Sequence, residues 1–408
     1  MEFAERLHAL MAERGISERE LAHQVNCDRS YIHLLKHGRR RAGQRMAQLL
    51  DDALGAQGSL AALSPQARPE VRLENFQPVS EAIDLGAWLE QTNTGSGTIG
   101  YLAATARQLA SEYTSKPPLM VLNDAVGVQR RLTGLLRGGR QRPAQTIDLC
   151  RISAEVFALL TLLCSDIGQY PAANAYGHAG WICAQAAGSD LASALVLSAQ
   201  AKTAQWEKRY AEAASRARQG YELCPPAGAR VLLACQEANA AQALGDFARA
   251  SEALTQARAA QDALPPDPDD DGDTAWSCPL PREANYAAIV NLGSGDLARS
   301  IKQARRADEA WSEGAPWVYG TWAQVRIGAA IAHVRNGEAY GAAAEVAPVL
   351  SIAPEYRVVT ITDRLTYLNR LLQTRPYHGS PAAADLRDRI GEFCASSLRG
   401  KALTQGKG

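Results

Sequence analysis

The sequence predicts an all-α chain with two parts, a small N-terminal head and a long body of stacked helix hairpins. Apolar residues recur at helical spacing through most of the 408 residues, and no long stretch alternates as a β-strand would. Short glycine-containing turns also recur at similar intervals along the second half. The length and the 46% share of apolar residues suffice for two or three units, each with a buried core.

Residues 16–38 predict two short helices joined by a tight turn. Ser17 is suited to cap the first helix, and Glu20, three residues later, would complete a capping box. Asp28 is suited to cap the second helix, and Gly38 to end it. The residues expected on the inner faces of the two helices are Leu21, Ala22, Val25, Ile32 and Leu35.

The outer face of the second helix is basic and polar, and three arginines follow the helix directly. Residues 28–45 contain six Lys or Arg and one Asp, although the whole chain balances 43 cationic against 43 acidic residues. A solvated charged surface is the alternative. Together with the paired helices, however, the excess favours the reading of duplex DNA, because cations hold phosphates while Arg, Ser and His can meet base edges in the major groove. The outward side chains are Arg29, Ser30, His33 and Lys36.

Residues 3–54 resemble the five-helix Xre, or lambda-repressor-type, DNA-binding domain. The match is carried by Glu-Leu-Ala at 20–22, Ser-Tyr-Ile at 30–32 and Gly-Arg-Arg-Arg at 38–41. It implies that the turn before the recognition helix and the first two turns of that helix contact bases. Leu34 departs from the pattern, since many relatives carry a polar base reader there, and a contact with a thymine methyl group is expected instead. The predicted DNA-binding residues are Glu18, Arg29, Ser30, Tyr31, His33, Leu34, Lys36, Arg39, Arg40, Arg41, Gln44 and Arg45.

Four segments are expected along the chain. A helix-turn-helix domain would occupy residues 1–56, and a linker marked by Gly and Pro would occupy residues 57–80, with at most one short helical turn. A helical connecting region would span residues 81–147, and an α-solenoid residues 148–400. Helices of the connecting region are expected at 82–90, 99–113 and 119–137.

A repeat is visible in the solenoid region. Each of five short segments would join two helices, and each is followed by small residues, mainly Ala. Such hairpins bury their apolar faces only against their neighbours, so the set would form a curved solenoid. The segments lie about 37 to 50 residues apart and resemble degenerate, lengthened tetratricopeptide repeats, whose usual period is about 34. The five segments are 167–170, 206–210, 244–247, 295–297 and 336–340.

The wider chain resembles a group of actinobacterial-type regulators that join an Xre head to a tetratricopeptide-like body. Landmarks of this resemblance are Trp88 to Asn93, Gly-Thr-Ile at 97–99, Tyr113 and Pro-Pro at 117–118. The resemblance implies transcriptional regulation, and it identifies neither the signal nor the operator.

Other motifs favour no catalytic or metal-dependent function. Gly95-Ser-Gly-Thr-Ile-Gly100 matches a dinucleotide-binding pattern, but a helix precedes it, so we interpret it as an interhelical loop. The acidic segment 267–273 imitates a calcium loop that would place Cys278 where a bidentate Glu is needed, so we interpret it as a solvated insertion. No nucleophile elbow, metalloprotease motif or phosphate loop occurs. We therefore expect no enzyme activity, no cofactor and no bound metal.

The eight cysteines include no Cys-x-x-Cys pair, so buried reduced thiols are expected rather than a zinc site. No run of 18 apolar residues exists and the N-terminus does not resemble a signal peptide. These features predict a soluble cytoplasmic protein without a membrane partner.

A ligand site is expected on the concave face of the solenoid, where aromatic and amide side chains would recognise a small molecule or a peptide. Burial of the same aromatics in the core is the alternative, and Trp317, Tyr319 and Trp322 form the densest cluster. The candidates are Asn174, Tyr176, Gln205, Trp206, Asn239, Gln242, Asn285, Tyr286, Trp317, Tyr319, Trp322 and Gln324.

The sequence thus predicts a sequence-specific transcription regulator that binds double-stranded DNA as a homodimer. Its body would mediate dimerisation and sense an effector. Alternatives are a scaffold that docks on the transcription machinery and an antitoxin-like repressor, each with a DNA-binding head and no small ligand.

Overall fold

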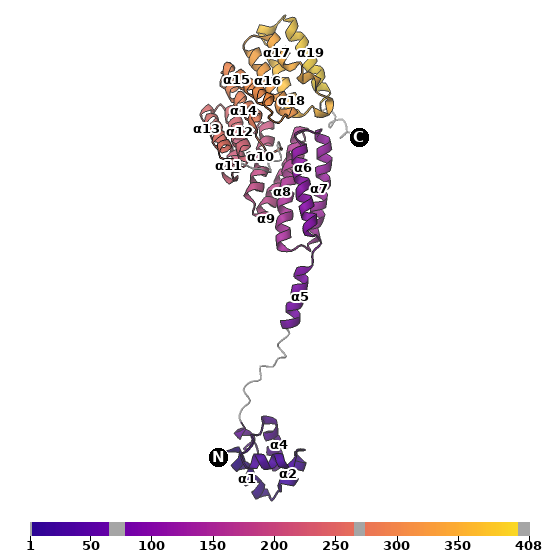
Figure 1. Cartoon of the computed structure of the whole chain (residues 1–408), viewed down its shortest axis with the longest axis vertical. Helices are drawn as coiled ribbons and strands as arrows, with labels where there is room; N and C mark the ends of the chain where they lie inside the picture. The colour runs from indigo at the N-terminus through magenta and orange to yellow at the C-terminus, as the bar shows by residue number, and fades with distance from the viewer. Residues whose placement is uncertain (1, 65–77, 265–273, 399–408) are drawn as a thin grey trace. The chain divides into compact units, whose positions relative to one another are not determined.

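The computed structural model describes residues 2–64, 78–264 and 274–398 (Figure 1). Within these residues every regular element is a helix, which confirms the all-α class. The chain divides into two compact units, Met1–Trp88 and Leu89–Gly408. No helix of the described part combines the length and the apolar character that crossing a membrane requires. The acidic segment 267–273 and most of the expected linker lie outside the described residues.

The head holds four α-helices and a short 3₁₀ turn, where five helices were expected. Its core includes the predicted inner residues Leu21, Ile32 and Leu35, all completely buried. Leu60, which we assigned to the linker, is also completely buried in this core. The head therefore extends past residue 56, and the 3₁₀ turn is the expected short helical turn. The elements are α1 (Phe3–Arg14), α2 (Glu18–Gln24), α3 (Arg29–Lys36), α4 (Gln44–Leu54) and the 3₁₀ turn Ala61–Leu63.

A buried carboxylate fixes the end of the head. Asp51 of α4 is 2% exposed and accepts hydrogen bonds from the backbone N–H groups of Gly58, Leu60 and Ala61 at 2.6, 2.6 and 2.9 Å. Burial alone would raise the pKa of Asp51, but these three bonds outweigh it and hold the pKa below its usual 3.8. The segment that follows α4 is thereby folded back on the head.

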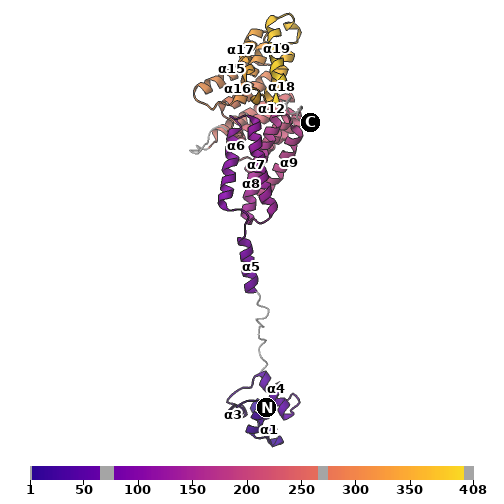
Figure 2. The same cartoon turned by 90° about the vertical axis from the view of Figure 1, so that its right-hand side faces the viewer.

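Three helices connect the head to the repeats. They are α5 (Pro78–Glu90), α6 (Ser96–Glu112) and α7 (Pro118–Gly138), close to the predicted ranges. In both views α6 and α7 lie beside α8 (Pro143–Asp166), and the three helices contact one another (Figures 1 and 2). Our interpretation of the glycine motif at 95–100 as a loop was wrong. Only Gly95 precedes the helix, and residues 96–100 form the first turns of α6.

The five predicted joints all lie between paired helices, which confirms the hairpin repeat. Each hairpin packs one helix against the next, and a final pair follows the fifth hairpin. After α8 the helices are α9 (Tyr170–Ala187), α10 (Asp190–Trp206), α11 (Tyr210–Leu223), α12 (Gly228–Ala243), α13 (Phe247–Asp262), α14 (Leu280–Gly293), α15 (Leu297–Ser312), α16 (Tyr319–Arg335), α17 (Ala339–Val346), α18 (Val359–Leu371) and α19 (Pro381–Ala395).

The hairpins form two layers. The helices α8, α10, α12, α14, α16 and α18 contact one another in succession and make the inner layer, while their hairpin partners make the outer layer. Close approach depends on small residues: a Cβ atom at Gly220 of α11 would lie 2.6 Å from Leu233 Cδ2 of α12. Because α18 also contacts α8, the inner layer closes on itself and surrounds an interior space.

Candidate nucleic-acid interface and ligand cavity

The helix expected to read DNA, α3, is anchored by one apolar face. Ile32 and Leu35 point into the core of the head, and Gly38, with φ of 70°, turns the chain away after the last residue of the helix. The hydroxyl of Ser17 accepts a hydrogen bond from the backbone N–H of Glu20, so the predicted cap of α2 is present. Asp28 occupies the cap position of α3, but its side chain makes no capping bond, and that prediction was wrong.

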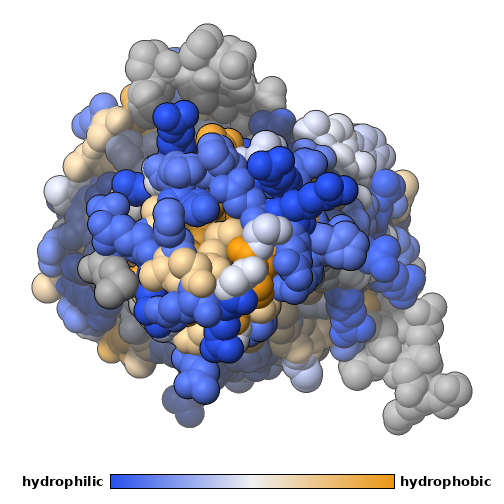
Figure 3. Space-filling view, turned by 90° about the horizontal axis from the view of Figure 1, so that it is seen from below, coloured by the Kyte–Doolittle hydropathy of each residue, from blue (hydrophilic) through white to orange (hydrophobic). Residues whose placement is uncertain are grey.

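The predicted DNA-contacting side chains mostly face solvent. Figure 3 shows one face of the head, where hydrophilic residues surround a small hydrophobic patch. The exposed members of the predicted set are Arg29, Ser30, His33, Arg39, Arg40, Arg41, Gln44 and Arg45, and the half-buried members are Glu18, Tyr31, Leu34 and Lys36.

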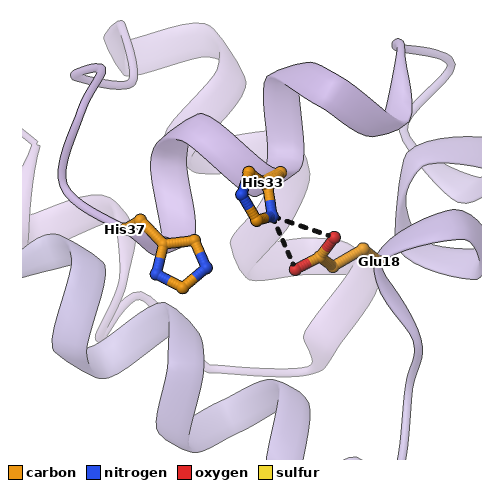
Figure 4. Close-up of side chains that lie close together, drawn as sticks. All are labelled: Glu18, His33 and His37. Atoms are coloured by element: carbon orange, nitrogen blue, oxygen red, sulfur yellow. Dashed lines mark hydrogen bonds and ion pairs between the residues drawn. The ribbon is translucent and has the colours of Figure 1, made fainter.

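Glu18 of α2 organises the cationic side of α3. Its carboxylate, 15% exposed, lies 3.8 Å from Arg29 Nε, 3.2 Å from His33 Nδ1 and 3.4 Å from Lys36 Nζ. The contact with His33 is drawn in Figure 4. Burial acts to raise the pKa of Glu18, but hydrogen bonds and charges from His33 and Lys36 outweigh it and hold the pKa below 4.5. A carboxylate at this place orients the cations rather than meeting phosphates itself.

The same carboxylate belongs to a group of three side chains with metal-binding chemistry. Glu18, His33 and His37 each offer one ligand atom, and these atoms lie within 4.8 Å of one another (Figure 4). No other group of this kind occurs among the described residues. Two imidazoles and a carboxylate suit a transition metal such as zinc. His33 lies on α3 and His37 directly follows its last residue, so an ion at this place would cover the surface expected to contact DNA.

The arginine segment after α3 is exposed and tied to that helix. The backbone N–H groups of Arg39 and Arg40 both donate to the carbonyl of Leu34, at 2.9 and 3.1 Å. The guanidinium of Arg40 lies 4.8 Å from the centre of the Tyr31 ring. In the described residues no carboxylate pairs with Arg39, Arg40 or Arg41 within 4.0 Å. These cations are therefore available to phosphates.

The inner layer of the body surrounds a cavity of about 890 Å³. Its walls come from the end of α6 and from α8, α10, α12, α14, α16 and α18. Eight of the twelve predicted ligand-binding residues line it: Gln205, Trp206, Asn239, Gln242, Asn285, Tyr286, Tyr319 and Gln324.

The remaining four predicted residues lie elsewhere. Asn174 lines a smaller cavity of about 460 Å³ and donates a hydrogen bond to Glu207. The ring of Tyr176 stacks on Phe157 beside the core. Trp317 is 60% exposed, and Trp322 packs against core residues. The rings of Trp317 and Trp322 lie 6.0 Å apart, but only Tyr319 of the three members of the expected cluster faces the cavity.

Sequence reasoning missed the charged residues of the cavity, since it considered only aromatic and amide side chains. The sequence did contain a signal for them, because a Lys or Arg within an Ala-rich inner helix is unusual and could have been listed as a candidate. The cations are Lys202, Lys208, Arg282, Arg335, Arg364 and Arg370, and the carboxylates are Asp166 and Asp363.

One part of the cavity wall is a closed polar network. The hydroxyl of Tyr113 donates to Asp166 Oδ2 at 2.7 Å, and Lys202 Nζ lies 2.7 Å from the same hydroxyl and 2.8 Å from Asp166 Oδ1. Burial and the charge of Asp166 raise the pKa of Tyr113 well above its usual value, so the phenol keeps its proton. These groups satisfy one another and shape the wall.

The cysteines carry no reactive signature. All eight are free thiols, four buried and four half-buried, where we expected all to be buried. Burial raises the pKa of Cys164, Cys183 and Cys224 to about 11, which leaves little thiolate at neutral pH.

No protein-family model and no curated protein matches this chain. The resemblances to the Xre domain and to the tetratricopeptide repeat rest on the motifs quoted above.

Proposed function

We propose that the protein is a sequence-specific DNA-binding transcription regulator whose body mediates dimerisation and binds an effector. The observation that carries this proposal is the surface of α3 and the arginine segment behind it. An apolar face fixes the helix in the head, while its other face presents Arg29, Ser30 and His33 to solvent. That combination suits insertion into the major groove, with the arginine segment on the phosphates.

Dimerisation is part of the proposal for a physical reason. A single recognition helix buries too little surface for tight specific binding, whereas a two-fold pair reads two half-sites about one helical turn apart. Helix α5 offers apolar surface for such a contact, since Ile83 and Trp88 are each 65% exposed. An effector in the body would act on DNA binding only if it bound the competent and incompetent arrangements unequally.

The test begins with selection of bound duplexes from random-sequence DNA by the purified full-length protein. Binding of the selected duplex is then compared between wild type and Arg29→Ala. We expect the substitution to weaken binding by about 5- to 150-fold, equivalent to about 1–3 kcal/mol for a base contact, and to relax the preference at one base pair. The matched control is Arg130→Ala, which removes an exposed arginine of α7.

Two outcomes would contradict the proposal. One is that no duplex is enriched at any salt concentration by well-folded protein. The other is that Arg29→Ala keeps both the affinity and the base preference of the wild type.

A further inference from the structure

We propose that the cavity of the body binds a small aromatic anion, a carboxylate or a phosphate ester, whose charged group pairs with Arg364. This inference deepens the proposed effector site by naming the chemical class of the effector.

The cavity is positively charged although the chain is neutral. Six cationic side chains line it against the two carboxylates Asp166 and Asp363, whereas the chain as a whole has a formal charge of zero. A recess with low-dielectric walls focuses such a charge and raises the local concentration of anions. The cavity therefore selects against cationic ligands.

Among the half-buried cations of this cavity, Lys202, Arg282 and Arg364, the last uses the fewest of its hydrogen-bond donors. It is half-buried on α18, and Nη1 donates to Gln324 Oε1 at 2.7 Å. No carboxylate of the described residues pairs with it within 4.0 Å, although buried charges are normally paired. A guanidinium has five N–H donors in a planar fork that fits carboxylate or phosphate oxygens. Burial lowers the pKa of Arg364 to about 10, so the group stays charged at neutral pH.

Three of the other cations are already engaged, while Lys208 and Arg370 are exposed to solvent. Lys202 pairs with Asp166 in the closed network described above. Arg335 donates to the carbonyl of Leu292 at 2.6 Å and to the hydroxyl of Tyr367 at 2.7 Å. Arg282 donates to two backbone carbonyls of the loop before α14. These three side chains build the wall, and Arg364 is the half-buried cation left for a ligand.

The position of Arg364 is supported from α16. Gln324 donates to the carbonyl of Thr360 at 2.6 Å, which fixes the amide so that its oxygen meets the guanidinium. Gly328 lies one turn further along α16, and a Cβ atom there would come within 3.4 Å of Arg364 Nη2. Gly328 therefore borders the guanidinium directly. Gln324 is thus a positioning residue for the anion site.

The rest of the wall suits a neutral, aromatic body. Tyr286 and Tyr319 line the cavity together with Trp206, and their rings offer apolar faces. Two buried amide oxygens, Gln205 Oε1 and Asn285 Oδ1, have no hydrogen-bond partner among the residues that the structure describes. They would accept from hydroxyl or amino groups on the ligand. A volume of about 890 Å³ lies within the range of small-molecule sites.

The experiment measures binding of three naphthalene probes to the full-length protein by calorimetry. Naphthylacetate and naphthyl phosphate carry the anion, and naphthylacetamide has nearly the shape of the first without its charge. We expect the wild type to bind at least one anion about tenfold to a hundredfold more tightly than the amide, the range for a charged hydrogen bond. The anion that binds more tightly shows whether the site prefers a carboxylate or a phosphate ester.

Variants assign that preference to the site. Arg364→Gln should abolish it while leaving the affinity for the amide within about twofold, and Arg364→Lys should keep part of it, since the charge remains but the planar fork is lost. Arg305→Gln, on the exposed surface of α15, is the matched control and should behave as wild type. Circular dichroism and thermal melting of each variant test whether the body is folded. If Arg364→Gln does not fold, Arg364→Lys alone is used for the comparison.

The inference is overturned if the amide binds as tightly as both anions, if no probe binds the folded wild type, or if Arg364→Gln retains the preference. None of these measurements contains DNA. Their failure therefore leaves the DNA-binding proposal standing, and a failure of DNA binding leaves these measurements interpretable.

Discussion

Replacing the arginine segment with alanine should reduce DNA affinity in a way that depends on salt and not on sequence. Arg39, Arg40 and Arg41 are all exposed and none pairs with a carboxylate of the described head. Contacts to phosphates carry no direct sequence information. The triple variant should therefore lose affinity for a selected duplex and for a scrambled duplex by the same factor.

The magnitude follows from the number of cations. Each phosphate contact contributes about 0.9 to the slope of the logarithm of the binding constant against the logarithm of salt concentration. Arg40 already lies over the Tyr31 ring, so two or three contacts per head are expected. The slope should become shallower by about 1.8 to 2.7 for each head, or about twice that for a dimer.

Fluorescence anisotropy of the full-length protein, with both duplexes at several salt concentrations, measures this slope. The matched control replaces Arg130, Arg131 and Arg137 of α7 with alanine, which removes the same charge from the exposed surface of the body. A slope equal to that of the wild type, or a loss confined to the selected duplex, would refute the reasoning.

The remaining predictions concern stability. Asp51→Asn should destabilise the head by about 3 kcal/mol, because backbone donors lose a charged acceptor, and hydrogen exchange of residues 58–61 should report it. The folded pKa of Asp51 is depressed, so its stabilisation is present above the usual carboxyl range and is lost as the pH falls through the lowered value. The protection factors of these amides in the wild type, which correct for the intrinsic pH dependence of exchange, should therefore fall in acid. Glu237→Gln should lower the melting temperature of the body by about 5 °C, because this completely buried carboxylate binds two arginines; an unchanged melting curve would contradict the assignment. Gly220→Ala should cost about 1–3 kcal/mol by clashing with Leu233, whereas Gly134→Ala, in open space on α7, should stabilise by up to about 1 kcal/mol in the same urea titration.

Local chemistry explains what the sequence predicted well. The inner residues of α2 and α3 follow helical spacing, and the Ser17 cap needs only its own helix. The five joints combine a turn, often with glycine, and small residues at close-packed positions, a pattern that each hairpin carries within itself. Features of this kind depend on neighbours within a few residues, so a single sequence is enough to place them.

Features that depend on tertiary contacts were the ones missed. The role of Asp51 requires the chain after α4 to fold back on the head, and no sequence pattern around Asp51 predicts this fold-back. Asp28 looked like a cap by residue type, yet its side chain makes no capping bond. Trp317 shares a short segment with Tyr319, but the segment precedes the helix and leaves the indole in solvent. Arg364 faces the cavity only because the inner layer closes on itself, which depends on contacts between helices far apart in the sequence.

The polar residues of the inner layer support a binding role for the cavity. Asn239 and Gln242, three residues apart on α12, face the same space as Asn285 and Tyr286 on α14. The opposite sides of both helices are rich in alanine and pack against the outer layer. A cavity that served stability alone would be filled by apolar side chains, because packing contributes more than partly satisfied polar groups. This interior is open and charged, and it contains amide oxygens without a partner among the described residues. These properties favour recognition of a ligand with matching groups.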